Sequence, residues 1–207
     1  MTSDKLEFQQ IFKEYQPKIL RYLTRLTGKY EAEDLSQEVF IKVDSGLKNF
    51  RGESKLSTWI YRIATNTAVD RMRNPSFKYK VNEGILSEPE QKDYIDTEDK
   101  DLFTGERAES TDQQFVRKEM NSCIRNHIEN LQENYRSVVI LSELEGLKNK
   151  EIAEILNLSL DTVKIRLHRA RAQLKKKLES NCSFYQNEQN ELSCDLRNEY
   201  EEYSKEY

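Results

Sequence analysis

Residues Leu147–Lys177 read LKNKEIAEILNLSLDTVKIRLHRARAQLKKK, and this stretch decides the fold around it. A first helix, from Asn149 to Leu156, has one apolar face, made by Ile152, Ala153 and Leu156. Asn157 then tolerates the left-handed backbone of a sharp corner, and Ser159 is a good N-cap for a second helix. The second helix has an apolar stripe at steps of four, three and four residues, made by Val163, Leu167, Ala170, Leu174 and Leu178. The pattern predicts a helix-turn-helix.

The opposite face of this second helix is basic. No acidic residue occurs between Thr162 and Leu178. A helix with an apolar back and a basic front fits the major groove of DNA, where Lys and Arg reach phosphates or guanine edges and His reads a base edge. The candidate DNA-facing residues are Thr162, Lys164, Ile165, His168, Arg169, Arg171 and Lys175. The alternative interpretation is a solvated Lys-rich helix on an ordinary bundle.

Bulk composition restricts the class of protein. The chain has 207 residues, 34% of them charged, and a net charge of −4, so any basic character is local. It lacks an apolar run long enough to span a membrane, and we expect a cytoplasmic protein. Three cysteines are too few for a disulfide scaffold, and two histidines leave little acid–base chemistry. No P-loop, Ser/His/Asp set or metal cluster is recognisable, so we expect no enzyme activity and no cofactor.

The N-terminal part predicts three helices. Helical spacing of apolar residues runs from Phe8 to Leu26, and Gly28 ends that helix. A second helix begins near Glu31 and buries Leu35, Val39, Phe40 and Val43. Its outward face, polar with one aliphatic residue, suits docking onto another protein, although a solvated face would look the same. The residues of that face are Asp34, Gln37, Glu38 and Ile41.

A loop, residues 48–54, with Ser54 as N-cap, leads into the third helix from Lys55 to Arg73. Its buried stripe is predicted to be Leu56, Trp59, Ile60, Ile63, Ala64 and Thr67. Aromatic, amide and guanidinium groups lie outside, a mixture that can stack on unpaired bases and hold a single strand. These outward residues are predicted to be Thr58, Tyr61, Arg62, Asn66, Asp70, Arg71 and Arg73.

Three motifs in this order resemble the extracytoplasmic-function (ECF) class of RNA polymerase sigma factors. They are EDLSQEVF (Glu33–Phe40), NFRGESKLSTWIYRIATNTAVDRMR (Asn49–Arg73) and EIAEILNLSLDTVKIRLHRARAQLKKKL (Glu151–Leu178). The resemblance covers about 135 of the 207 residues. It implies a factor that binds RNA polymerase core, directs it to a two-part promoter and helps to open the DNA.

The resemblance also implies roles for individual residues. Asp34, Gln37, Glu38 and Ile41 would contact the coiled coil of the beta-prime subunit, and the helices from Met120 to Leu144 would seat on the flap of the beta subunit. An unstacked base of the minus-ten element would be captured by Phe50, Arg51, Glu53 and Ser54. The upstream edge of the bubble would be held by Arg62, Asn66, Arg71 and Arg73, beside Tyr61. In the minus-thirty-five duplex, Lys164, Ile165, His168 and Arg169 would read bases, and Arg166, Arg171 and Lys175 would contact phosphates.

Three residues depart from the family pattern. Lys148 replaces a common Ser or Thr cap, which removes a contribution of about 1 kcal/mol at the start of the first helix of the motif. Asp161 replaces a frequent Gly, and a carboxylate there disfavours some sequences and accepts a hydrogen bond from cytosine in others. Ile165 replaces a small or hydroxylic residue and suits contact with a thymine methyl. The minus-thirty-five sequence is therefore not transferable from relatives.

Charge alternates along the chain and indicates four parts. The net charges are +3 for residues 1–74, −5 for 75–117, +3 for 118–179 and −5 for 180–207. We therefore expect an all-α protein of two small helical domains, an N-terminal bundle (1–74) and a C-terminal helix-turn-helix bundle (118–179). An acidic flexible linker (75–117) joins them, and an acidic tail containing Cys and Tyr (180–207) follows.

The tail leaves alternatives open. It is either a loosely docked extension or a segment that lies over the basic recognition helix and weakens DNA binding. Cys123, His127, Cys182 and Cys194 are candidate ligands of a zinc or redox site, although no CxxC pair supports it. Other possibilities are a free-standing helix-turn-helix regulator that works without polymerase, and a sigma factor regulated by an anti-sigma partner.

Overall fold

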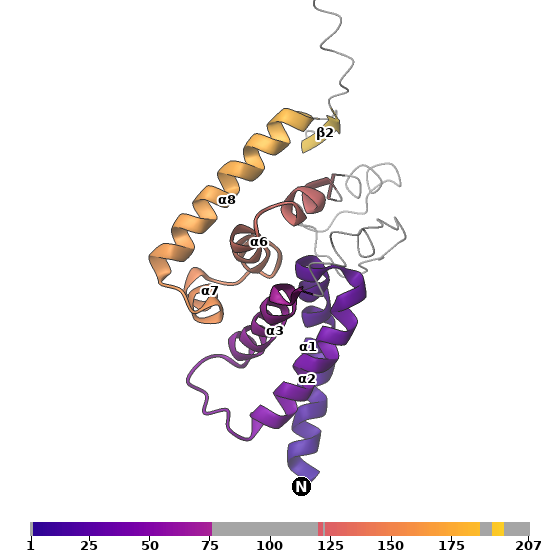
Figure 1. The fold of residues 1–207 in the computed structure, drawn as a ribbon, viewed down its shortest axis with the longest axis vertical. Coiled ribbons are helices and arrows are strands. Elements are labelled where there is room, and N and C mark those ends of the chain that lie inside the picture. Colours follow the sequence, from indigo (N-terminus) through magenta and orange to yellow (C-terminus); the bar gives the residue numbers. More distant parts are fainter. Residues whose placement is uncertain (1, 76–119, 122, 187–191, 197–207) are drawn as a thin grey trace, which may run out of the picture. The chain divides into compact units, whose positions relative to one another are not determined.

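The computed structural model describes residues 2–75, 120–121, 123–186 and 192–196 (Figure 1). This part of the chain is almost entirely helical, which confirms the all-α prediction. It falls into two compact units, Met1–Glu88 with Glu129–Arg171 and Pro89–Ile128 with Ala172–Tyr207. Apart from Pro75, the predicted linker lies outside the described residues. Within these residues, no helix combines the length and the apolar composition that a membrane span requires.

Three N-terminal helices, α1 (Thr2–Thr27), α2 (Lys29–Leu47) and α3 (Leu56–Arg73), pack against one another (Figure 1). Gly28 ends α1 as predicted, because its φ of 87° suits glycine and turns the chain directly into α2. Each helix contributes an apolar stripe that is fully buried. The stripes comprise Ile19, Tyr22, Leu23 and Leu26 of α1, Leu35, Val39 and Val43 of α2, and Ile60, Ala64 and Ala68 of α3.

Short helices form the second half of the first compact unit: α6 (Glu133–Val139), a π-helical turn η1 (Ile140–Leu144) and α7 (Asn149–Leu156). The long helix α8 (Leu160–Asn181) follows. The buried apolar side chains of these helices are Val138, Val139, Ile140, Leu141, Ile152, Ile155, Val163, Leu167 and Ala170. The buried face of α7 is slightly rotated from the predicted one, since Ile155 is buried in place of Leu156.

The corner between α7 and α8 has the predicted helix-turn-helix geometry. Asn157 adopts the left-handed conformation with φ 51°, and the Ser159 hydroxyl accepts the Thr162 N–H at 3.1 Å. At the start of α7, Lys148 supplies no side-chain cap. The Glu151 carboxylate instead accepts the Lys148 N–H at 2.9 Å, which is one half of a capping box. This bond offsets part of the weak start expected from Lys148.

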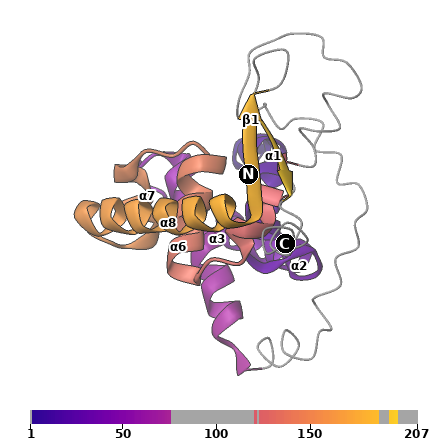
Figure 2. The ribbon, with the colours of Figure 1, turned by 90° about the horizontal axis from the view of Figure 1, so that it is seen from above.

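A two-stranded antiparallel hairpin follows α8 and was not predicted. Strand β1 (Cys182–Gln186) begins directly where α8 ends and pairs with β2 (Leu192–Leu196), as Figure 2 shows. The register places Cys182 opposite Leu196 and Phe184 opposite Cys194. Residues 182–186 and 192–196 of the tail therefore form strands, while residues 187–191 and 197–207 lie outside the described part.

Helix α3 is covered on two sides, which corrects the predicted outward face. It packs on α1 and α2 and also on α7. Thr58 and Tyr61, expected outside, are buried with 1% and 4% of their surface exposed. The predicted cap is also wrong by one residue, because α3 begins at Leu56 with Lys55 at the N-cap position, and Ser54 does not cap it.

Candidate nucleic-acid interface

The outer face of α8 is basic and exposed. Lys164, His168 and Arg169 are exposed, and Ile165 exposes 52% of its surface among them. Arg166 and Thr162 are half-buried, and the Thr162 hydroxyl lies 2.8 Å from the Ser159 hydroxyl in the cap. The predicted residues therefore all lie on α8. Thr162 also takes part in the N-cap of this helix.

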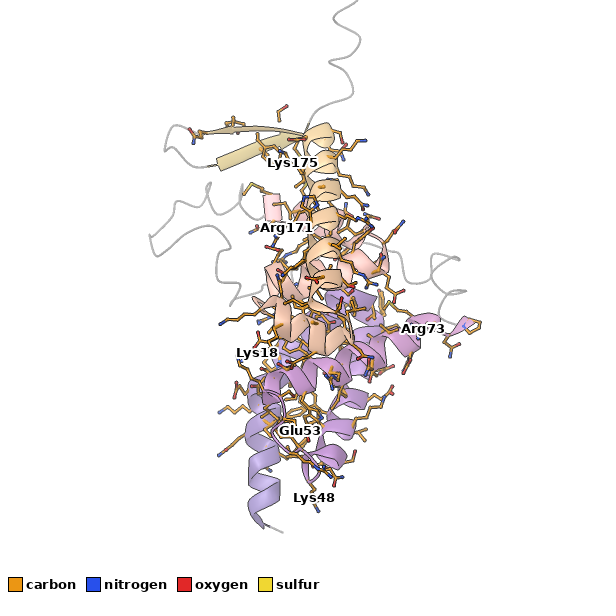
Figure 3. All side chains as sticks on the ribbon, turned by 90° about the vertical axis from the view of Figure 1, so that its left-hand side faces the viewer. Lys18, Lys48, Glu53, Arg73, Arg171 and Lys175 are labelled. Carbon is orange, nitrogen blue, oxygen red and sulfur yellow. The ribbon has the colours of Figure 1, made fainter. Side chains whose placement is uncertain are left out.

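Carboxylates lie beside several of these cations. Arg171 donates to Glu143 Oε1 at 2.6 and 3.1 Å, and Lys175 lies 3.6 Å from Glu179 (Figure 3). Lys164 is 3.6 Å from Asp161, one of the three residues that depart from the family pattern. All three pairs are solvent-exposed, so each contributes little to stability and can exchange its carboxylate for a DNA phosphate.

The predicted docking face of α2 is present as an exposed stripe. Asp34 and Gln37 are exposed, and Ile41 exposes 71% of its surface. Tyr30, 59% exposed, extends the same stripe by one turn. Tyr30 was not predicted, although its i,i+4 spacing to Asp34 was a visible signal.

Glu38 belongs to this stripe but has partners inside the protein. Its carboxylate accepts from Lys42 Nζ at 2.7 Å and from Arg71 at 3.4 Å, and Arg71 also donates to Glu31 at 2.7 Å. The Lys42 hydrogen bond is the main cause that holds the pKa of Glu38 below its usual range. Glu38 therefore links α2 to α3 as well as facing outward.

A groove of about 310 Å³ runs beside this stripe. It is lined by Phe12, Gln16 and Leu20 of α1 and by Glu33, Ser36 and Gln37 of α2. Phe12 exposes 42% of its surface there. An apolar ring beside exposed polar groups extends the surface that a partner protein can contact.

The loop between α2 and α3 carries the predicted base-capture residues. Arg51 and Glu53 are exposed, and the loop lies at the end of α2 with Lys48 and Glu53 on it (Figure 3). The Phe50 ring packs on Trp59 with centroids 5.1 Å apart. The two rings are tilted by 37°, and Gly46 leaves room for the indole, because a Cβ there would lie 3.0 Å from it. Trp59 of α3 is half-buried and supports the Phe50 ring. Ser54, in the loop, is also half-buried.

The predicted strand-holding residues of α3 differ in exposure. Arg62, Asn66 and Arg73 are exposed, and Arg71 is half-buried. Tyr61 donates its hydroxyl to Glu145, and Arg62 Nε donates to the Glu154 carbonyl at 2.9 Å. Burial first, and then the Glu145 charge, raise the pKa of the Tyr61 hydroxyl. Tyr61 and Arg62 are therefore engaged within the protein in this structure.

Further contacts hold α7 and the end of η1 against the N-terminal helices. Arg25 forms an ion pair with Glu145 at 3.0 Å, with 12% and 6% of the two side chains exposed. Lys55 pairs with Glu151 at 2.7 Å. The Lys55 hydrogen bond, followed by that from the Lys148 backbone, lowers the pKa of Glu151.

This lowered pKa predicts an acid-sensitive contribution to stability. Because Glu151 has a lower pKa folded than unfolded, its contribution is complete above the unfolded value of about 4.3 and is lost as pH falls through the folded value. We expect the difference in thermal midpoint between wild type and Glu151→Gln to shrink from pH 6 to pH 3. Asp70→Asn, which replaces an exposed carboxylate of α3, is the control. A Glu151 difference that is constant over this range would contradict the prediction.

The four candidate Cys and His ligands do not form a metal site in the part of the chain that the structure describes. Among those residues, no group of three or more His, Cys, Asp or Glu could hold a metal ion. Two of the four, Cys123 and Cys182, do lie together, with their sulfurs 3.9 Å apart.

Comparisons with known proteins agree with this geometry. Residues 11–76 match the family described as Sigma-70 region 2, and residues 122–174 match Sigma-70, region 4. The chain is 34% identical over 176 residues to the ECF RNA polymerase sigma-E factor of Haemophilus influenzae, covering 85% of this chain and 89% of that one. It is 34% identical over 178 residues to the ECF sigma factor SigW of Bacillus subtilis, covering 84% and 90%. The fold matches the sigma factor RpoE of Bartonella quintana, solved with the anti-sigma factor NepR, with TM-score 0.60, 22% identity and coverage of 84% and 97%.

The two family matches, one over the three-helix bundle and one over the basic helix-turn-helix, place the chain among transcription initiation factors of the sigma-70 type. The chain belongs to the ECF class of RNA polymerase sigma factors.

Proposed function

We propose that this sigma factor binds the coiled coil of the beta-prime subunit through the exposed stripe of α2. The observation that carries the proposal is the aliphatic side chain of Ile41, 71% exposed on a helix whose opposite face is fully buried. Asp34 and Gln37 add polar groups beside it, and Tyr30 adds an aromatic ring. Interfaces of this kind gain most of their affinity from a few such apolar and aromatic anchors.

The loop between α2 and α3 captures an unstacked minus-ten base in the proposed mechanism. Phe50 offers a ring held by Trp59, and Arg51, Glu53 and Ser54 offer polar groups around it. Asn66, Arg71 and Arg73 hold the strands further along α3, and Tyr61 and Arg62 join them when they leave Glu145 and the Glu154 carbonyl. Aromatic support matters because stacking contributes about 1–3 kcal/mol per base.

The minus-thirty-five duplex is bound by α8. Lys164, Ile165, His168 and Arg169 face outward from the first turns and meet base edges, while Arg166, Arg171 and Lys175 contact phosphates. The flap of the beta subunit binds the helices from Met120 to Leu144. Promoter recognition is thus divided between residues 1–74 and 118–179, joined by the acidic segment 75–117.

The factor acts by binding and positioning, without catalysing a reaction, and works in the cytoplasm with RNA polymerase. Regulation by an anti-sigma factor is supported by a relative of the same fold, RpoE of Bartonella quintana, whose structure includes one. The groove and stripe on α1 and α2 are the described surface best suited to such a partner.

Run-off transcription with purified core polymerase tests the proposal, on promoters found by genomic selection. We expect transcription to require the protein, and the concentration for half-maximal transcription to rise at least 10-fold for Asp34→Ala/Ile41→Ala, since loss of interface anchors costs about 1–2 kcal/mol each. Glu38 is left intact because its removal would also disturb Arg71 and Lys42.

Glu14→Ala is the matched control, since it removes an exposed carboxylate from α1 and leaves the stripe of α2 intact. Equal loss in the control and the double variant would contradict docking through α2. A protein that binds duplex DNA alone and adds nothing to core polymerase would instead be a free-standing regulator.

A further inference from the structure

Two thiols meet in the second compact unit. Cys123 lies on the helical residues 123–129, and Cys182 is the first residue of β1, directly after the end of α8. Their sulfurs are 3.9 Å apart, although the residues are 59 positions apart in sequence. Cys182 has 1% of its surface exposed, and Cys123 is half-buried.

The distance between the sulfurs is the contact distance of two thiols. A disulfide requires an S–S distance of about 2.05 Å, so the sulfurs must approach by roughly 2 Å. Small rotations of two side chains about their Cα–Cβ bonds move sulfur by this amount. A bond between them would join the end of α8 to the helix at residues 123–129.

Cys194 is the third thiol, and the hairpin register makes it a poorer disulfide partner for Cys182 than Cys123 is. Side chains alternate across a strand, so Cys182 and Phe184 lie on the same face of the hairpin as Cys194, which is opposite Phe184. Cys194 is therefore diagonal to Cys182, where Cβ atoms are about 7 Å apart, beyond the roughly 4.5 Å that a disulfide allows. The geometry selects Cys123 over Cys194 as the partner of Cys182.

We propose that Cys123 and Cys182 are a reversible dithiol–disulfide pair, oxidised by hydrogen peroxide and reduced by a dithiol. The thiolate of Cys123, the more exposed residue, attacks one peroxide oxygen, which gives a sulfenic acid and releases hydroxide. This hydroxide takes up the proton that the Cys123 thiol lost and becomes the first water. The Cys182 sulfur then attacks the sulfenic sulfur, and the sulfenic hydroxyl leaves with the Cys182 proton as the second water. Two thiols and one peroxide thus give one disulfide and two waters.

The local environment sets the rate of this oxidation. Burial first, and then the hydrogen bond with Cys182, raise the pKa of the Cys123 thiol. A raised pKa leaves less thiolate at neutral pH, so oxidation is slow at pH 7 and accelerates as pH rises toward the raised pKa of the thiol. The pair is therefore suited to sustained exposure to peroxide.

Thiol counting and peptide mapping on the reduced full-length chain test the pair. After treatment with hydrogen peroxide, we expect wild type to lose two of its three titratable thiols and Cys194→Ala to lose both that remain. Cys123→Ser should keep both of its thiols over the same time, whereas Cys182→Ala should lose only the Cys123 thiol, as a sulfenic acid that dimedone traps. Dithiothreitol should restore the wild type. Trypsin alone leaves Cys182 and Cys194 in one peptide, so a second cleavage after Glu188 or Glu191 is needed to identify the linked sulfurs.

Thermal unfolding gives a second measurement that needs no variant. Closing a loop of this length is expected to raise the thermal midpoint of the oxidised chain by about 10 °C, reversed by dithiothreitol. Retention of all three thiols, a linked peptide containing Cys194 in place of Cys123, or loss of thiols from Cys123→Ser at the wild-type rate would overturn the proposal.

Discussion

Replacing Lys164 and Arg169 together with alanine is expected to weaken binding of the polymerase holoenzyme to its minus-thirty-five duplex by about 100-fold. Both side chains are exposed on the outer face of α8, away from the buried stripe of that helix. Each contact to a phosphate or guanine edge contributes about 1–3 kcal/mol, and 1.4 kcal/mol corresponds to a factor of ten. Fluorescence anisotropy over a salt series measures both the affinity and the salt slope. Loss of one phosphate contact lowers the slope by about 1, so this variant, whose two residues are proposed to meet base edges, should lower the slope by less than about 2.

Lys13→Ala/Lys18→Ala is the control for this experiment. It removes the same charge from the surface of α1 and leaves α8 unchanged. A decrease in affinity as large as that of the α8 variant would mean that net charge alone drives binding. Affinity within threefold of wild type for Lys164→Ala/Arg169→Ala would exclude α8 as the reading helix.

Replacing Trp59 with alanine is expected to abolish most promoter opening. The indole packs on Gly46 and stacks with Phe50, so its removal leaves the loop ring unsupported and opens a void at the end of α2. A large-to-small change of a partly buried aromatic costs about 2–4 kcal/mol of stability. We expect open-complex formation, followed by 2-aminopurine fluorescence at the minus-ten element, to fall at least 10-fold.

Trp59→Phe separates the two effects of this change. It keeps a ring against Phe50, so opening should recover to within about threefold of wild type while stability recovers only in part. Measurements belong at a temperature where circular dichroism shows all variants folded. Normal opening by the folded alanine variant would contradict the role of Trp59 as the support of Phe50.

Local signals in the sequence were sufficient to predict the helix-turn-helix. The left-handed Asn157, the Ser159 cap and the apolar stripe of α8 depend on neighbours within a few residues, and the structure has all three. The exposed stripe of α2 was predictable for the same reason, because α2 buries one face and leaves the other to solvent.

Features that depend on distant partners could not be predicted. Thr58 and Tyr61 look outward from the periodicity of α3, but both are buried in the structure. Tyr61 contacts the Tyr22 ring of α1 and donates to Glu145, and α3 also packs on α7, which lies some 90 residues later in the sequence. The hairpin is a similar case, since residues 182–186 and 192–196 form short strands that gain stability from pairing with each other, and the sequence of residues 187–191 carries no turn signal such as Asn-Gly.

Glu145 would compete with a DNA strand for the Tyr61 hydroxyl. It accepts the Tyr61 hydroxyl and forms the ion pair with Arg25, so any DNA strand that takes Tyr61 must first displace the carboxylate. If only a fraction of molecules has released Tyr61, the apparent affinity for that strand is the intrinsic affinity multiplied by this fraction. If Tyr61 holds a promoter strand as proposed, promoter affinity is thermodynamically linked to the free energy that holds Glu145 in place. A ligand that favours the released state would then raise this affinity without touching DNA.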